Sequence, residues 1–377
     1  MKLSFLSSFP PKSCGVGQFC FDLIASLKKI DSTLEAQVYA IDDIPDGYAY
    51  DQAIVVDHFF YQDKDSYSKT AQLINQDGAD ICVIQHEFGL FGGENKEYLF
   101  DFVDSIKVPI VVVVHSVPVD PNYPSFNFHK DHLLRLAKKT AYFITMSQVG
   151  KDGLIALGIT PDRVKVIIHG APRLPPLAEA PALKKALGLT GFFTLIMFGL
   201  LNKQKGIEYL LDAAAEIKNK LNNLKVLVIG TPLGAKDLPY VEMIKEKIST
   251  LKLDDTVEFI QKYFFQIDLF RYIVASDIIL TPYLSTNQTS SGVLAFSIAA
   301  GIPIITTPYP FAVELLKNVG VFVPYRDSRA IGKEILKLAT DRNYYLAQQQ
   351  KTIALGTTLS WDNKAAEYLA LFKQIIS

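Results

Sequence analysis

Residues 285–310 read "STNQTSSGVLAFSIAAGIPIITTPYP", two apolar segments with an unusual beginning. The small and apolar residues from Gly292 onward, followed by a β-branched run, predict a buried helix and then a buried strand. Gln288, Ser290 and Ser291 stand just before the helix. Polar and tiny residues at a helix start are typical either of an ordinary loop or of an anion site that uses main-chain N–H groups.

The same alternation of apolar runs and helical stretches extends along the whole chain. Apolar runs of four to eight residues are typical of strands covered on both faces of a parallel sheet. The first half contains "KLSFL", "AQVYAI", "ADICVIQ", "VPIVVVVH", "AYFITMS" and "RVKVIIHG", and the second contains "FFTLIMFGL", "LKVLVIG", "TVEFI", "DIILTPY" and "IPIITTP". This pattern predicts an α/β protein built of doubly wound, Rossmann-like halves.

The 377 residues suit two domains, and the 49% hydrophobic content can supply two cores. The stretch "GAPRLPPLAEAPALKKALGL" has four prolines between residues 172 and 181, which predicts a linker. The tail "LSWDNKAAEYLALFKQIIS" predicts an amphipathic helix with Ser360 as N-cap and Trp361 as an apolar anchor. We therefore expect domains at 1–172 and 173–357, and a terminal helix at 358–377.

Composition excludes several classes of protein. The net charge of -1 argues against a nucleic-acid partner, although residues 1–172 carry a net -6 and residues 173–377 a net +5. An anionic ligand is therefore expected in the second half. Three scattered cysteines suit a reducing cytoplasm rather than a disulfide framework or a metal site. No apolar run reaches the roughly 20 residues of a membrane-spanning helix, so we expect a cytoplasmic protein without a transmembrane segment.

Ligands of open parallel sheets bind beyond the carboxyl ends of the strands, so the residues there are the first candidates. Gly15 and Gly17 in "SSFPPKSCGVGQF" allow a backbone to approach a ligand, although a Gly-assisted turn explains them equally well. Gln85, His86 and Glu87 in "IQHEFGLFGG" are three adjacent polar residues at a strand end, which predict a hydrogen-bonding site. The alternative is that His86 and Glu87 cap the next helix.

Three further strand ends offer chemistry. His115 closes "VPIVVVVHS", where it suits a ligand hydroxyl or proton transfer unless it is simply a core histidine. Lys205 and Gly206 stand at a predicted helix start, where the helix dipole and an ammonium together favour a phosphate. Residues 290–292 form a second such start. Two phosphate-suited helix starts in the more basic half predict a diphosphate ligand.

These segments together resemble glycosyltransferase family 4, and the resemblance covers nearly the whole chain. It is carried by "FPPKSCGVGQF", "QHEFGLFGG", "HS" at 115–116, "VIIHGAP", "FGLLNKQKG", "PYLSTNQTSSGVLAFSIAAGIPIITTPYPFAVELL" and the terminal "SW". The resemblance implies the GT-B fold, two Rossmann-like domains that face a central cleft. It also implies a hexosyltransferase that retains the anomeric configuration, with the acceptor on the first domain, the donor on the second and the last helix crossing back to the first.

The resemblance implies a UDP- or GDP-linked sugar as donor substrate, a carbohydrate or glycolipid acceptor, no cofactor and no metal. Peripheral membrane contact is left open. The site residues carried over are His115 and Gln288 as catalytic; Lys205, Ser290, Ser291, Gly292 and Val293 at the donor diphosphate; Tyr263 and Phe296 at the nucleoside; and Gly15, Gly17, His86 and Glu87 in loops near acceptor and donor.

The chain departs from the family at several positions. The usual Glu-x7-Glu pair aligns with Gln288 and Phe296, and an expected arginine aligns with Leu200, whereas Lys205 is kept. Gln288 can still hydrogen-bond a sugar, but Phe296 cannot bind ribose hydroxyls. We interpret the chain as a variant subgroup, similar to sequences reading "Q-x-x-S-G-x-L-A-[YF]", some of which are linked to mannosyl transfer.

Two other classes are weighed against this interpretation. A non-catalytic sugar-nucleotide-binding subunit would explain the lost carboxylates. An NAD-dependent dehydrogenase shares the alternating pattern but needs a full glycine fingerprint, which is absent. The carboxylates of "IDDIPDG" near residue 42 are expected to lie in a solvated loop rather than to hold a metal.

Overall fold

A computed structural model describes all residues from Met1 to Ser377. The chain divides into two compact units: Met1–Gly170 with Asn287–Gly292 and Trp361–Ser377, and Ala171–Thr286 with Val293–Ser360. Each unit contains one sheet in which every paired strand is parallel. The predicted α/β fold with two parallel-sheet halves is confirmed.

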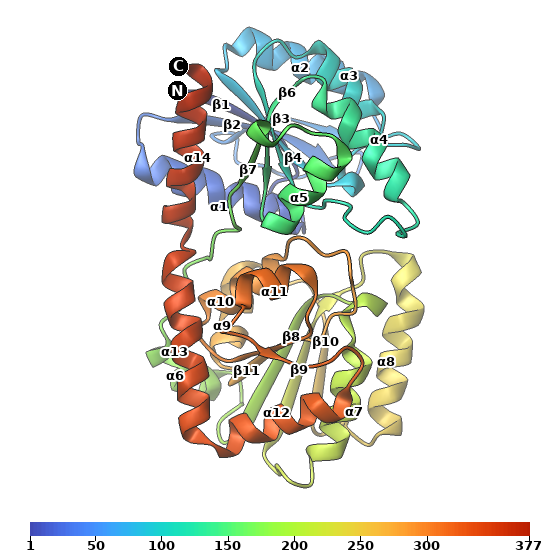
Figure 1. Cartoon of the computed structure of the whole chain (residues 1–377), viewed down its shortest axis with the longest axis vertical. Helices are drawn as coiled ribbons and strands as arrows, with labels where there is room; N and C mark the ends of the chain where they lie inside the picture. The colour runs from blue at the N-terminus through green and yellow to red at the C-terminus, as the bar shows by residue number, and fades with distance from the viewer. The chain divides into compact units, whose positions relative to one another are not determined.

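The sheet of the first unit has seven strands in the order β3-β2-β1-β4-β5-β6-β7, and helices flank it on both faces (Figure 1). Its strands are β1 (Lys2–Ser7), β2 (Glu35–Asp42), β3 (Val55–Phe60), β4 (Ile81–His86), β5 (Ile110–Val114), β6 (Thr140–Thr145) and β7 (Val164–Val166). Its helices are α1 (Gly15–Ile30), α2 (Lys64–Asp77), α3 (Tyr98–Ser105), α4 (Phe126–Ala137), α5 (Gln148–Leu157) and α14 (Trp361–Ile376), with short 3-10 turns η1 (Phe88–Leu90) and η2 (Pro161–Arg163).

Burial on both faces explains the composition of the central strands. All five residues of β5 are buried because helices cover the sheet on either side. On one face the terminal helix α14 packs on α1, and Ala365, Tyr368 and Phe372 enter the same apolar cluster as Leu23 of α1. The tail predicted as an amphipathic helix therefore forms part of the core of the first unit.

The second unit has six strands in the order β10-β9-β8-β11-β12-β13 (Figure 1). Its strands are β8 (Phe193–Leu200), β9 (Leu224–Thr231), β10 (Val257–Gln261), β11 (Ile278–Thr281), β12 (Ile304–Thr306) and β13 (Val321–Phe322). Its helices are α6 (Ala180–Ala186), α7 (Ile207–Ile217), α8 (Leu238–Thr250), α9 (Gln266–Val274), α10 (Gly292–Ala299), α11 (Pro310–Leu316), α12 (Ser328–Thr340) and α13 (Arg342–Thr358), with turns η3 (Leu177–Glu179), η4 (Lys203–Lys205) and η5 (Ala235–Asp237).

The proline-rich stretch after residue 170 carries more structure than the sequence suggests. It contains η3 and α6, and α6 lies against α9. Pro181 stands in the first turn of α6, where the missing N–H group costs no helical hydrogen bond. Leu177 and Leu183 pack against the core of the second unit.

The carboxylates near residue 42 give a correction. Asp42 ends β2 and is only 1% exposed, so the expectation of a solvated loop is wrong for this residue. Its carboxylate accepts hydrogen bonds from the Tyr50 hydroxyl at 2.5 Å and from Nδ1 of His58 at 2.7 Å. A buried carboxylate needs such partners, and here they tie the loop after β2 to the end of β3.

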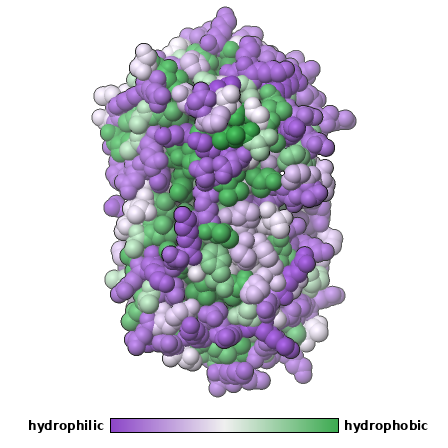
Figure 2. Space-filling view, in the orientation of Figure 1, coloured by the Kyte–Doolittle hydropathy of each residue, from purple (hydrophilic) through white to green (hydrophobic).

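The surface is mixed. On the face shown in Figure 2, hydrophilic residues predominate and apolar residues are interspersed among them. None of the helices is long and apolar enough to cross a bilayer.

Candidate active site

Both glycines of the predicted first loop lie in the first turn of α1, and their surroundings differ. Gly17 is buried, and a Cβ there would lie 3.0 Å from the main-chain nitrogen of Phe9. Gly17 is therefore required by the close packing of α1 against the loop. Gly15 is exposed, with open space where a side chain would stand. Of the two, only Gly15 leaves room for a ligand.

The three polar residues at the end of β4, Gln85, His86 and Glu87, have different surroundings. Gln85 and His86 are both fully buried, but successive strand residues point to opposite faces of a sheet. Glu87 accepts hydrogen bonds from the Phe88 main-chain nitrogen at 3.0 Å and the Ser116 hydroxyl at 2.6 Å. Glu87 thus caps the turn η1, as the alternative interpretation has it, and also holds the end of β5. Burial raises the pKa of its carboxyl group.

His86 lies inside the first unit, among aromatic rings. Its Nε2 is 3.2 Å from Nε2 of His132 on α4, and the rings of Phe88 and Phe91 lie against it. Burial lowers the pKa of His86 well below its usual value and that of His132 to about 4, so both imidazoles are neutral at pH 7. The structure does not bring His86 together with the other predicted loop residues at a surface.

His115 follows β5 directly and is partly exposed. Its Nε2 is 2.8 Å from Oε1 of Gln85, and the ring of Phe19 meets it edge-on at 4.9 Å between centroids. Desolvation, with a smaller contribution from His169, lowers the pKa of His115 to about 3. A neutral imidazole at a strand end can exchange hydrogen bonds with a ligand hydroxyl.

Residues 287–292 group with the first unit. The Ser290 hydroxyl donates to the main-chain oxygen of His115 at 2.5 Å, and Asn287 Oδ1 accepts from the main-chain nitrogen of Val119 at 2.8 Å. Gln288 donates through Nε2 to the Ser290 main-chain oxygen at 3.1 Å. In this arrangement the Ser290 hydroxyl proton is already used, so any anion at this helix start depends on main-chain N–H groups.

Helix α10 begins at Gly292 and continues with Val293, as predicted for a helix after a strand end. Ser291, just before it, is buried. The first N–H groups of a helix have no intrahelical acceptor and carry partial positive charge, which suits an anion.

Lys205 is the notable group of the second unit. It ends the turn η4, and its Nζ lies 3.8 Å from the ring centroid of Tyr283. Its ammonium forms neither a salt bridge nor a hydrogen bond; the residue is partly exposed, and desolvation lowers its pKa to about 8. Gly206 follows with φ +66, and a Cβ there would clash with the Pro282 carbonyl oxygen at 2.3 Å, so only glycine fits. This geometry holds a desolvated ammonium one residue before α7.

The two residues predicted at the nucleoside lie in aromatic pairs. Tyr263 meets Phe265 edge-on at 5.5 Å in the loop before α9. Phe296 on α10 meets Phe270 edge-on at 5.5 Å and packs against the core of the second unit.

Two contributors were not predicted from the sequence as site residues. Ser116 contacts Glu87, and Tyr283 contacts Lys205. Their position in the sequence could have indicated them, because each lies just beyond the end of a buried strand.

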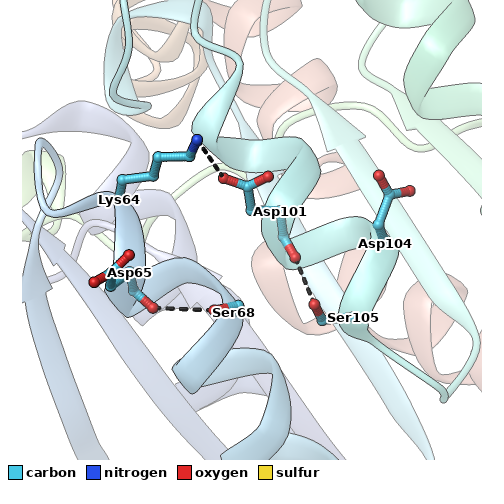
Figure 3. Close-up of a pocket in the computed structure, with 6 residues that line it drawn as sticks. All are labelled: Lys64, Asp65, Ser68, Asp101, Asp104 and Ser105. Atoms are coloured by element: carbon cyan, nitrogen blue, oxygen red, sulfur yellow. Dashed lines mark hydrogen bonds and ion pairs between the residues drawn. The ribbon is translucent and has the colours of Figure 1, made fainter.

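A separate hollow lies between α2 and α3, with a volume of about 290 Å³. Figure 3 shows its lining residues, Lys64, Asp65, Ser68, Asp101, Asp104 and Ser105. Lys64 forms an ion pair with Asp101 at 3.8 Å. None of the predicted site residues lines this hollow, so it is not the candidate site.

Sequence comparisons show which known proteins the chain is similar to. Residues 193–341 match the sequence model of the family described as "Glycosyl transferases group 1". The chain is 25% identical over 250 residues to an uncharacterized glycosyltransferase of Methanocaldococcus jannaschii, and the match covers 61% of this chain but only 59% of that relative.

Solved structures resemble nearly the whole chain. The Anabaena protein HepE, in complex with UDP and glucose, is 18% identical with a TM-score of 0.78, and the match covers 99% of this chain and 100% of HepE. Sucrose-phosphate synthase from Thermosynechococcus elongatus is 14% identical with a TM-score of 0.78, with 100% and 99% of the two chains covered. The chain therefore has the GT-B fold, and residues 193–341 are similar to group 1 glycosyl transferases.

Proposed function

We propose that the protein transfers a sugar from a nucleoside-diphosphate sugar to an acceptor hydroxyl, with retention of anomeric configuration. The bond between the anomeric carbon and the diphosphate oxygen breaks, and a bond to the acceptor oxygen forms as that oxygen loses its proton. The group 1 match supports this proposal, because Lys205, Gln288 and the start of α10 all lie within residues 193–341.

The observation that carries the proposal is the unpaired ammonium of Lys205. Lys205 is partly exposed but partly desolvated, and such a cation without a counter-charge is stabilised when a ligand supplies negative charge. A leaving diphosphate would supply that charge, and the charge grows in the transition state. Lysine binds phosphate as a point charge, which suits a site whose other donors are main-chain N–H groups.

The remaining roles follow from the chemistry of each group. The N–H groups from Ser291 to Val293 at the start of α10 would hold the phosphates. Gln288 would hydrogen-bond the donor sugar as both donor and acceptor, and neutral His115 would orient a sugar hydroxyl. Tyr263 and Phe296 would contact the nucleoside.

The donor and acceptor are proposed by class. The HepE structures hold UDP, glucose or UDP-glucose, which makes UDP the first base to test, with GDP second. Mannose remains our first sugar for the Gln288 variant. A carbohydrate or glycolipid is proposed as acceptor, and the cytoplasm as the location.

A ligand panel tests the proposal. The unfolding temperature of the wild-type protein should be measured with UDP, GDP, ADP and their sugars. Release of nucleoside diphosphate from each sugar nucleotide should be measured over time. A ligand present at 100 times its dissociation constant stabilises the folded state by about 2.7 kcal/mol. Stabilisation by one nucleotide, together with its release from the matching sugar, is the expected result. No stabilisation by any nucleotide would contradict the proposal.

A second candidate function rests on the two replaced carboxylates. Because Gln288 and Phe296 stand where relatives are expected to carry glutamates, the site could bind a sugar nucleotide without catalysis. The same panel separates the two functions. Stabilisation by the donor without transfer or hydrolysis would favour the non-catalytic subunit.

A further inference from the structure

Gln85 is a fully buried amide that no proposed role has used. It pairs with Val113 in the register of β4 and β5, and the main-chain nitrogen of His115 continues the pairing by donating to the His86 carbonyl at 2.9 Å. Since side chains alternate along a strand, His115 lies on the same face as Val113 and Gln85. The strand pairing therefore sets the amide beside the imidazole.

The contact between the two side chains is specific. Oε1 of Gln85 lies 2.8 Å from Nε2 of His115, and this is the one hydrogen bond of the amide, because its Nε2 has no partner. The Phe19 ring closes another side of the imidazole. A buried amide that leaves its own donor unsatisfied is unfavourable by itself. A buried amide at position 85 is explained if its contact with His115 contributes to function.

We propose that Gln85 is a positioning residue that fixes His115 as the neutral tautomer with the proton on Nε2, so that Nδ1 accepts a hydrogen bond from a hydroxyl of the donor sugar. This inference rests on the proposed function, which assigns His115 to the sugar. The amide oxygen can only accept, so the ring nitrogen that faces it must carry the proton, and the other ring nitrogen of a neutral imidazole then keeps its lone pair.

The surroundings of His115 favour the same state. Nδ1 has no partner within the chain, and His115 is partly exposed, so the lone pair is open to a ligand. Desolvation together with the nearby His169 lowers the pKa of His115 to about 3. The imidazolium, which has no acceptor nitrogen, is therefore excluded across the neutral pH range.

Nuclear magnetic resonance tests the tautomer without any substrate. In protein carrying ¹⁵N-labelled histidine, the His115 signals are identified by their loss in His115→Ala. We expect a proton on Nε2 and a lone pair on Nδ1 at pH 7 in the wild type, and a mixture of tautomers in Gln85→Leu. A proton on Nδ1 in the wild type, or an unchanged spectrum in Gln85→Leu, would overturn the proposal.

Kinetics tests the consequence. We expect Gln85→Leu to lower kcat about ten- to hundredfold with little change in the KM of the donor, as for a misplaced catalytic group. Gln37→Leu, the same change on β2 of the same sheet, should leave kcat unchanged. An unchanged kcat in Gln85→Leu would contradict the positioning role. If the wild type transfers no sugar at all, the proposed function fails, whereas the tautomer measurement still decides the role of Gln85.

Gln85→Glu gives a second variant with a readout in pH. A carboxylate beside Nε2 stabilises the imidazolium and raises the pKa of His115. We therefore expect the variant to lose activity as the pH falls through the raised pKa, at values where the wild type stays active. A pH profile identical to that of the wild type would overturn the proposal.

Discussion

The two units treat their desolvated basic groups differently. In the first unit the imidazoles of His86 and His115 each have a neutral partner, since Nε2 of His86 faces His132 and Nε2 of His115 faces Gln85. In the second unit the ammonium of Lys205 has only the Tyr283 ring beneath it. Both environments lower the pKa, but at pH 7 the histidines lose their charge and Lys205, with a pKa of about 8, keeps it.

This difference indicates that the buried histidine pair is part of the structure, whereas Lys205 lacks a partner that a ligand could supply. The His86 and His132 imidazoles are neutral and buried, so their contact belongs to the core of the first unit and requires no ligand charge. The Lys205 ammonium is partly desolvated and partly exposed, and no carboxylate of the chain forms an ion pair with it, so negative charge from a ligand would stabilise it. The comparison therefore predicts that changes at Lys205 affect ligand binding, while changes at the buried histidine pair affect stability.

The largest expected effect follows from removing the lone cation. Lys205→Ala should weaken donor binding and lower turnover ten- to hundredfold, because a charge-assisted hydrogen bond contributes roughly 1.5–3 kcal/mol. Without ligand, the variant should unfold at no lower temperature, since a desolvated charge has been removed. Donor titration and initial rates measure the first effect, and thermal unfolding measures the second.

Lys203 offers a matched control for Lys205. It lies in the same turn η4, but its side chain is exposed, so Lys203→Ala should bind and turn over donor as the wild type does. Equal losses in the two variants would indicate a general charge effect. Normal kinetics in folded Lys205→Ala would remove Lys205 from the site.

Two histidines that end neighbouring strands sharpen the comparison. His115→Ala should fold and bind free nucleoside diphosphate nearly normally but transfer sugar poorly, because the lost group acts at the sugar. His86→Ala should instead lose stability by about 2–4 kcal/mol, since it leaves a cavity and an unpaired His132. Denaturant unfolding and transfer rates on both variants test this division. A collapse of nucleotide affinity in His115→Ala would contradict its role at the sugar.

The fold was largely predictable from the sequence because buried parallel strands have a strong signal. The five consecutive apolar residues of β5 exemplify it. The edge strands β3 and β13 were missed for physical reasons. In β3 the residues Val56 and His58 are exposed and the polar pair Asp57–His58 interrupts the apolar residues, and β13 has only two residues. Neither forms an apolar run.

The site was predictable only as a set of positions. Strand ends indicated Lys205 and His115, but the partners of His86 and Asp42 are 46 and 16 residues away along the chain. The sequence treats Gln85, His86 and Glu87 as one group, whereas the alternation of the strand points Gln85 and His86 to opposite faces of the sheet. Burial of Asp42 likewise depends on Tyr50, which no local pattern connects to it.

A smaller effect is expected in the pH dependence of stability. His132 has a pKa of about 4 in the folded protein, below the value near 6.5 of an unfolded chain, so the unfolded state takes up its proton first as the pH falls. Its contribution is complete above pH 6.5 and is lost progressively down to pH 4, by about 3 kcal/mol in total.

Replacement of His132 tests this contribution. Free energies of unfolding measured from pH 7 to pH 4 should fall less steeply in His132→Phe than in the wild type. Leu154→Ala, a change in the same apolar cluster, should lose stability equally at every pH and keep the wild-type slope. An unaltered slope in His132→Phe would show that the imidazole is not kept neutral by the fold.

The smallest expected effect is that of chelation. Enzymes that neutralise the leaving diphosphate with a divalent cation hold that cation with carboxylates. Lys205 and the N–H groups of α10 offer other chemistry, and the Asp42 carboxylate is already engaged by Tyr50 and His58. Initial rates of transfer should therefore survive excess EDTA, with untreated enzyme as the control. If EDTA abolished transfer and Mg²⁺ or Mn²⁺ restored it, the charge on the diphosphate would be neutralised by a metal, and the contrast between the two units would lose its functional meaning.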